Sequence, residues 1–127
     1  SDLQNTYRLF CGNCSVEFDT DHVELDIIKA IPCGLMLNEI ISNSFKYAFP
    51  PAFVGKGTIR VSYHERDDET IELIVSDNGV GLPPSVDPEK NKSLGLSLIY
   101  LLAEQIQGTI RIGREGGTRY TVTFSKT

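Results

Sequence analysis

The chain lacks a long hydrophobic run and has few basic residues, and both features exclude certain classes of function. No apolar run reaches the ~18 residues of a membrane-spanning helix, and no signal peptide opens the chain. The 12 Lys and Arg stand against 17 Asp and Glu, which gives a formal net charge of −5. General binders of nucleic-acid backbones carry the opposite sign. We therefore expect no nucleic-acid partner and no direct membrane contact, whether or not the parent protein is membrane-anchored. A local pocket for a nucleotide is compatible with this charge.

Cysteine is also scarce, and its pattern argues against metal or redox chemistry. Cys11 and Cys14 form a Cys-x-x-Cys pair, but only Cys33 and His22 lie near enough to complete a zinc site, at no recognisable spacing. A redox pair of this type opens a helix, whereas this one runs into a strand-like segment. We interpret it as a turn flanked by small buried thiols. The odd cysteine count, without a secretory signal, predicts a reducing compartment and hence a cytoplasmic location.

The 127 residues suit one compact domain, and their periodicity predicts its elements. Helices are expected over residues 2–10, 26–48 and 93–107, the last closed by Gly108 as a C-cap. Strands are expected over residues 14–19, 23–25, 57–65, 70–77, 109–114 and 118–125. This order is typical of an α+β fold, a two-layer sandwich with a mixed, mostly antiparallel sheet and helices on one face.

One carboxylate stands out at the end of a predicted strand. The apolar alternation of residues 71, 73 and 75 continues to Asp77, so its side chain points toward the core and needs hydrogen-bond donors. Asp77 could simply cap the turn that Asp-Asn-Gly favours. Alternatively, a ligand supplies the donor, for example the exocyclic amine of a purine. Gly79 and Gly81 would then let the backbone pass close beneath a flat ring.

The long predicted helix carries a polar stripe formed by Glu39, Asn43 and Lys46, at i, i+4 and i+7. An apolar stripe lies opposite and consists of Ala30, Cys33, Leu37, Ile41 and Ala48. The polar stripe could be a solvated face. In chemical terms, however, the Asn43 amide oxygen suits Mg²⁺, the Lys46 ammonium suits a phosphate, and the Glu39 carboxylate suits a general base.

Two glycine motifs complete the set of candidate signals. Gly95 opens a helix after a loop, where free N–H groups and the positive end of the helix dipole favour phosphates. Residues 116–118, Gly-Gly-Thr, form a turn before the last predicted strand. Each motif is common when taken alone.

Their order and spacing resemble the Bergerat ATP-binding fold. That superfamily includes sensor histidine kinases, type II topoisomerases, heat-shock chaperone ATPases, mismatch-repair ATPases and anti-sigma-factor kinases. The resemblance extends from about Ser15 to Phe124. The segment Leu-Met-Leu-Asn-Glu-Ile-Ile-Ser-Asn-Ser-Phe-Lys-Tyr-Ala-Phe-Pro, with Ser-Leu-Gly-Leu-Ser-Leu-Ile further on, is similar to the HisKA_2 or HWE-like histidine kinases.

The resemblance implies a role for each of the candidate residues. Asp77 would bind the adenine amine, with Gly79 and Gly81 beneath the base and Thr118 beside it. Asn43 would ligate Mg²⁺, and Glu39 would help to activate a phosphoacceptor histidine. Lys46 and Tyr47 would contact phosphate and ribose, and Gly95, with Leu94 and Leu96, would belong to the lid and phosphate-binding turn.

The sequence also departs from the family pattern. Lys92 and Ser93 stand where an earlier glycine is usual, and the short, proline-rich loop before Lys92 lacks a phenylalanine box. We expect this loop to be mobile without nucleotide. Neither His22 nor His64 has the helical context of a phosphorylated histidine, so the acceptor is expected on a separate domain.

The resemblance thus implies the catalytic domain of a two-component sensor histidine kinase that binds ATP and Mg²⁺. Residues 1–12 would connect it to an upstream domain, and residues 13–127 would form the catalytic domain. Its partners would be its own dimerisation and phosphoacceptor domain, a response regulator acting through that domain, and a second copy in a homodimeric parent protein.

Two alternative functions are each disfavoured by particular residues. An anti-sigma-factor serine kinase is disfavoured by Lys46-Tyr47, where such kinases carry a histidine-glycine element. A degenerate Bergerat domain that serves only as a protein-interaction module is disfavoured by Glu39, Asn43 and Asp77, since such a domain has no evident need for them.

Overall fold

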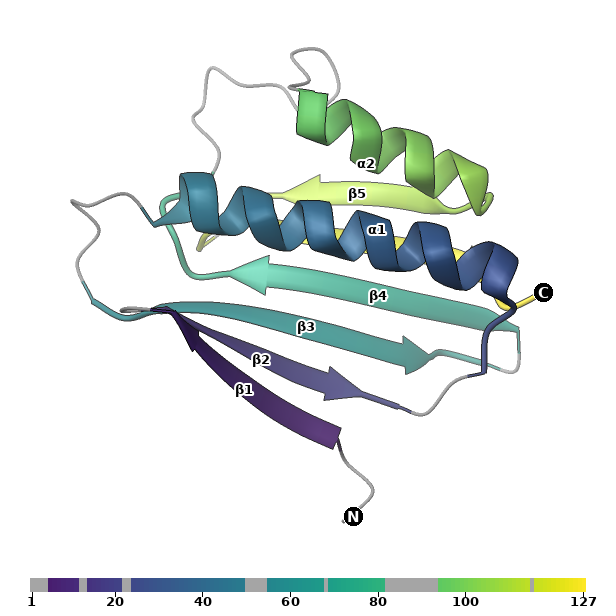
Figure 1. Ribbon diagram of the computed structural model, residues 1–127, viewed down its shortest axis with the longest axis horizontal. Helices are drawn as coiled ribbons and strands as arrows, with labels where there is room; N and C mark the ends of the chain where they lie inside the picture. Colours follow the sequence, from purple (N-terminus) through teal and green to yellow (C-terminus); the bar gives the residue numbers. More distant parts are fainter. Residues whose placement is uncertain are drawn as a thin grey trace.

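In the part of the chain that the structure describes, six strands form one sheet with two α-helices on one face (Figure 1). The computed structural model describes residues 5–11, 14–21, 24–49, 55–67, 69–81, 94–114 and 116–127. The strands are β1 (Asn5–Cys11), β2 (Cys14–Thr20), β3 (Gly57–Glu65), β4 (Thr70–Asp77), β5 (Thr109–Gly113) and β6 (Arg119–Ser125). They lie in the order β1-β2-β3-β4-β6-β5, with β2 and β3 parallel and the other neighbours antiparallel. The predicted α+β sandwich is confirmed.

The core lies between the helices and the inner face of the sheet. Alternate residues of β4 are buried from Ile71 to Asp77, and β6 buries every second residue in the same way. Helices α1 (Ile27–Asn43) and α2 (Leu94–Gln105) cover this face and contribute the fully buried Met36, Ile40 and Ile99. Removing these apolar side chains from water is the main force that holds the two layers together.

Helix α1 begins at an Asp26 N-cap, whose carboxylate accepts a hydrogen bond of 3.0 Å from the Ile28 amide. A five-residue π-helical turn, Ser44–Ala48, extends it. Its inward stripe differs from the prediction: Met36 and Ile40 are fully buried, whereas Leu37 and Ile41 are only half-buried. The reason is that α2 packs beside α1, so the side of α1 next to the polar stripe is covered as well. Within the described residues, no helix is long and apolar enough to cross a membrane.

The end of α2 corrects a second expectation. The residue in the left-handed region is Gln107, with φ of 56°, and not Gly108. The Gly108 amide bonds to the Ala103 carbonyl at 2.8 Å and the Gln107 amide to that of Glu104 at 2.9 Å, which is a Schellman motif with Gln107 at C′. Glycine is required at position 108 for a steric reason instead, because a Cβ there would lie 3.0 Å from the Thr123 carbonyl oxygen.

The prediction of a helix over residues 2–10 was wrong. Residues Asn5–Cys11 form β1, which pairs with β2 so that Cys11 lies opposite Cys14. Apolar residues at helical spacing misled the prediction, while the Thr, Tyr and Phe of this segment suit a strand that a hairpin partner stabilises. The short strand predicted over residues 23–25 is also absent at Glu24 and Leu25, the two of its residues that are described. Whether residues 1–12 connect to an upstream domain stays a prediction.

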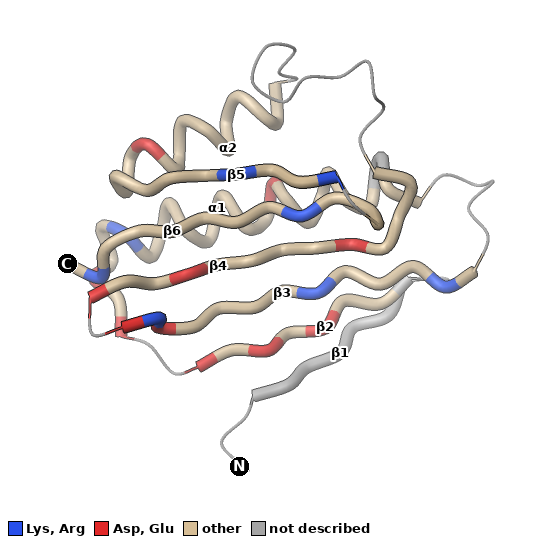
Figure 2. Tube along the Cα trace, turned by 180° about the vertical axis from the view of Figure 1, so that it is seen from behind, with Lys and Arg blue, Asp and Glu red and all other residues tan. Residues whose placement is uncertain are grey.

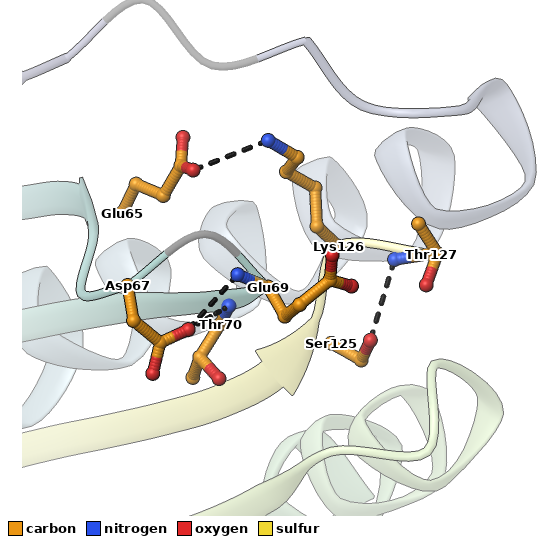
Figure 3. Close-up of polar contacts among 7 residues, drawn as sticks. All are labelled: Glu65, Asp67, Glu69, Thr70, Ser125, Lys126 and Thr127. Atoms are coloured by element: carbon orange, nitrogen blue, oxygen red, sulfur yellow. Dashed lines mark hydrogen bonds and ion pairs between the residues drawn. The ribbon is translucent and has the colours of Figure 1, made fainter.

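The end of the sheet where β3 turns into β4 is fixed by polar contacts (Figure 3). The Asp67 carboxylate accepts hydrogen bonds of 2.9 Å from the Glu69 and Thr70 amides, and the first of these is the main cause of its lowered pKa. Lys126 pairs with Glu65 at 3.1 Å. The Lys29 ammonium donates to the Ser125 and Thr127 carbonyls at 2.7 and 2.8 Å, so α1 is attached to the C-terminal strand.

Charged residues are spread along the strands of the sheet, as the view from behind shows (Figure 2). There His64 of β3 lies 2.9 Å from Asp21 through Nδ1 and 3.6 Å from Asp19 through Nε2, and Glu72 is its cross-strand neighbour. The hydrogen bond to Asp21 is the main cause of the raised pKa of His64, and the negative charges of both aspartates add to it.

The raised pKa of His64 makes its stabilising effect depend on pH. The contribution is fully present below the unfolded pKa of about 6.5 and is lost as the pH rises through the raised folded value. We therefore expect His64→Asn to lower the melting temperature more at about pH 5.5 than at about pH 8.5, as thermal melts of both proteins would show. An equal loss at both values would mean that the Asp–His contacts add no charge-dependent stability.

Candidate functional site

Asp77 is the centre of the candidate site. Its side chain, only 8% exposed at the end of β4, accepts three hydrogen bonds. The amides of Gly79 and Thr118 donate to Oδ1 at 3.0 and 3.2 Å, and the Ser44 hydroxyl donates to Oδ2 at 3.1 Å. The bond from Gly79 shows that Asp77 does cap its own turn. A carboxylate oxygen accepts about two hydrogen bonds, so Oδ2 still offers an acceptor position within the described part of the site.

The glycines around Asp77 are required by the packing of the protein itself. A Cβ on Gly79 would collide with the carbonyl oxygen of Ala48, which also accepts a hydrogen bond of 2.9 Å from the Val80 amide. A Cβ on Gly117 would collide with the Asp77 carbonyl oxygen. Gly81 has φ of +77°, in the left-handed region. The turn after β4, the end of the π-helical turn and the β5–β6 connection therefore meet at backbone distance.

The polar stripe of α1 faces the first turn of α2. A Cβ built on Gly95 would lie 3.2 Å from Asn43 Oδ1 and 3.3 Å from Glu39 Oε1. Two side-chain oxygens of α1 therefore lie close against the backbone of Gly95, which has no side chain to collide with them. The predicted stripe is confirmed as a geometric feature for Glu39 and Asn43, while the side chain of Lys46 lies outside the described residues.

Tyr120 connects these two groups of residues. Its phenol is 3% exposed on β6 and shares a hydrogen bond with the Asn43 side chain. This bond lowers the phenol pKa. Burial and the nearby Asp77 charge outweigh it and raise the pKa of Tyr120 to about 12. Tyr120 therefore helps to fix the orientation of the Asn43 amide, whose oxygen lies beside Gly95.

Sequence reasoning missed Tyr120 and Ser44, although both left a signal. Tyr120 is in the inward phase of β6 with Val122 and Phe124, and a phenol at such a position needs a polar partner. Ser44 follows Met36 and Ile40 at a spacing of four on the buried side of α1. A hydroxyl there likewise had to find an acceptor, which is Asp77.

The remaining candidate residues differ in their burial, and the structure does not describe all of them. Thr118 is buried. Its backbone bonds to Asp77 twice, because the Thr118 carbonyl also accepts a hydrogen bond of 3.0 Å from the Asp77 amide. Leu96 points into the core, whereas Leu94 is 89% exposed, so a ligand contact from Leu96 has to be made by its backbone. The backbone of Tyr47 lies in the π-helical turn, and its side chain is outside the described residues. The predicted lid, with Lys92 and Ser93, lies outside them too.

A sheet with a buried hydrogen-bond acceptor at the end of one strand, and with a polar helix stripe beside it, is typical of Bergerat-fold ATP-binding domains. Residues 28–127 match the model of the histidine kinase-, DNA gyrase B- and HSP90-like ATPases. The chain belongs to this family, as its motifs had predicted.

The similar proteins are histidine kinases. The chain is 35% identical over 98 residues to the sensor histidine kinase PdtaS of Mycobacterium tuberculosis, which is 74% of this chain and 19% of that protein. It is 24% identical over 107 residues to the blue-light-activated histidine kinase 2 of Erythrobacter litoralis, which is 84% of the chain and 30% of the relative. The chain thus spans less than a third of either relative.

Solved structures show the same fold. The histidine kinase domain of a blue-light-activated histidine kinase from Erythrobacter litoralis aligns with a TM-score of 0.83 at 22% identity, over 91% of this chain and 53% of that one. The catalytic domain of the histidine kinase ThkA, in a nucleotide-free form, aligns with a TM-score of 0.68 at 21% identity, over 91% and 81% of the two chains.

The crowding at Gly79 predicts that its substitution affects the empty protein. Gly79→Ala places a methyl group against the Ala48 carbonyl, so we expect the ligand-free domain to lose about 1–3 kcal/mol of stability. Chemical denaturation without nucleotide measures this loss. The matched control is Gly113→Ala, because a Cβ on Gly113 meets nothing within 4 Å. If Gly79→Ala were as stable as wild type, the glycine would serve a ligand and not the fold.

Proposed function

We propose that the chain is the catalytic domain of a two-component sensor histidine kinase, which binds Mg-ATP and transfers the γ-phosphoryl group to a histidine on a separate domain. The observation that carries this proposal is the buried Asp77 carboxylate, with an acceptor position on Oδ2 and a network that links it through Ser44 to the helix bearing Asn43. Membership of an ATPase family and the histidine kinase names of the relatives support it.

The base would be recognised at Asp77. Its Oδ1 is committed to the Gly79 and Thr118 amides, which fixes the carboxylate plane. Oδ2 would then accept from the exocyclic amine of adenine, with Thr118 beside the base and Gly79 and Gly81 beneath it. Guanine presents a carbonyl where adenine has the amine, so two acceptors would face each other. The site should therefore prefer ATP to GTP.

The residues beside Gly95 fit a divalent cation. Asn43 Oδ1 and Glu39 Oε1 both lie beside the first turn of α2, and hard oxygen atoms are the ligands that Mg²⁺ prefers. We assign Asn43 as the metal ligand, oriented by Tyr120. When bound, Mg²⁺ would neutralise phosphate charge and help to align the transferred group.

The other residues would position the reactants. Lys46 and Tyr47 would contact phosphate and ribose, and the start of α2, from Leu94 to Leu96, would face phosphate oxygens. Glu39 would take a proton from the attacking histidine and so raise its nucleophilicity. Most of the rate enhancement would come from positioning and charge neutralisation.

The acceptor histidine would belong to the protein's own dimerisation domain, from which a response regulator takes the phosphoryl group. The whole protein would be a homodimer with this domain in the cytoplasm. These assignments rest on the histidine kinase relatives, of which the chain matches only a part.

The role of Asp77 can be tested by calorimetric titration with ATP and GTP. A lost hydrogen bond to a charged group costs about 1.5–3 kcal/mol, so Asp77→Ala should weaken ATP binding at least ~10-fold. Glu72→Ala, which removes a carboxylate from the opposite face of the same strand, should leave it unchanged. Thermal melts of both variants confirm folding. If folded Asp77→Ala binds ATP like wild type, or wild type shows no preference for ATP over GTP, base recognition is elsewhere.

The metal role of Asn43 and its support by Tyr120 predict a dependence on Mg²⁺. Asn43→Ala should weaken Mg-ATP binding much more than metal-free adenosine binding. Tyr120→Phe removes the phenol that holds the amide and should produce a smaller loss of about 3–10-fold, again only with Mg²⁺. The control is Tyr63→Phe, a half-buried phenol on β3. Equal losses for both ligands would show that Asn43 and Tyr120 are only structural.

A further inference from the structure

Away from the candidate site, an apolar groove lies between α1 and the sheet. Its volume is about 400 Å³, and its walls are Ala30, Gly34 and Leu37 of α1, with Phe18 of β2 and Tyr63 of β3 opposite. The Cys33 thiol also lines it, and burial raises the pKa of this thiol to about 11. The lining is therefore uncharged under ordinary conditions.

The helix surface beside the groove is unusually apolar for an exposed surface. Ile27, Ile28, Ile31 and Leu35 are 66%, 76%, 56% and 53% exposed. These four large aliphatic side chains lie within nine residues of α1, and they continue the apolar lining outward. Contiguous exposed apolar patches of this kind mark interaction surfaces.

Gly34 gives an independent indication that something approaches this groove. It lies in the middle of α1, where glycine costs about 1 kcal/mol relative to alanine. Nothing lies within 4 Å of a Cβ built there, so the packing of the chain does not require glycine. The missing side chain deepens the groove at the point where α1 borders it.

The width of the sheet indicates a helix as the occupant. A helix is about 10 Å wide and strands are about 4.8 Å apart, so one helix covers about two strands. Within the described residues, the two helices therefore leave two of the six strands uncovered, and Figure 1 shows neither helix over β1 and β2. A further helix alongside α1 would complete the layer.

The charge around the groove indicates what kind of helix this is. Glu24 and Asp26 flank Leu25, which lines the groove. Lys29, the basic residue of α1, is turned away and bonds to the C-terminal carbonyls. A second copy of the chain would bring the same acidic rim against this one.

We propose that the groove between α1 and β2 binds an amphipathic helix of a partner, whose apolar stripe places one large side chain over Gly34 and whose flanking residues are basic. Helices recognised in this way present anchors at i, i+3, i+4 and i+7. The surface is separate from Asp77 and Asn43, so the proposal does not depend on nucleotide binding.

The test uses a synthetic helical peptide of about 18 residues, long enough to be partly helical, with Leu at those four spacings, Lys beside them and Ala elsewhere. Fluorescence anisotropy should show binding with a Kd on the order of 10 µM. A matched peptide with Glu in place of Lys should bind at least ~10-fold more weakly. Equal binding of the two peptides would overturn the charge argument.

Two variants locate the binding. Gly34→Leu fills the hollow and should weaken the Lys peptide at least ~10-fold, while its melting temperature is not lower than that of wild type, because Leu favours the helix. Leu101→Ser changes an exposed apolar side chain on α2 and should have no effect. Unchanged binding to Gly34→Leu would overturn the proposal. So would concentration-dependent dimerisation of the wild type through α1, since the occupant would then be a second copy.

Discussion

The structure around the candidate site depends on the burial of one carboxylate. The three donors to Asp77 come from its own turn, from the start of β6 and from the end of α1. These three segments meet at the end of β4. A buried charge without donors would be very unfavourable, so satisfying Asp77 forces these segments into one arrangement.

Steric crowding completes what the hydrogen bonds begin. The backbone of the Asp77 turn lies against Ala48 on one side and Gly117 on the other, at distances that no side chain would permit. The same logic holds where α2 crosses the polar stripe of α1 at Gly95. Glycine at these places lets segments far apart in sequence approach closely, and the polar groups of three elements consequently surround one site.

The sequence predicted most of the architecture because the determinants of β3, β4, α1 and α2 are local. Period-2 and period-3.6 patterns placed these elements, and the phase of β4 placed Asp77 inside. The errors arose where tertiary contacts decide. β1 is a strand because β2 pairs with it, and the buried side of α1 is shifted toward Met36 because α2 packs there. The partnership of Tyr120 with Asn43 joins residues from two elements, which no local pattern reveals.

Stability alone does not account for two features of α1, and they lie in different halves of the helix. In its first half, Gly34 weakens the helix beside an open apolar groove, and nothing in the packing requires it. Around its C-terminal end, the polar side chains of Asn43 and Ser44 form hydrogen bonds with Tyr120 and Asp77. Departures from local sequence rules are expected at functional sites. Helix α1 therefore carries both of the surfaces for which we propose ligands, one for a nucleotide and one for a helical partner.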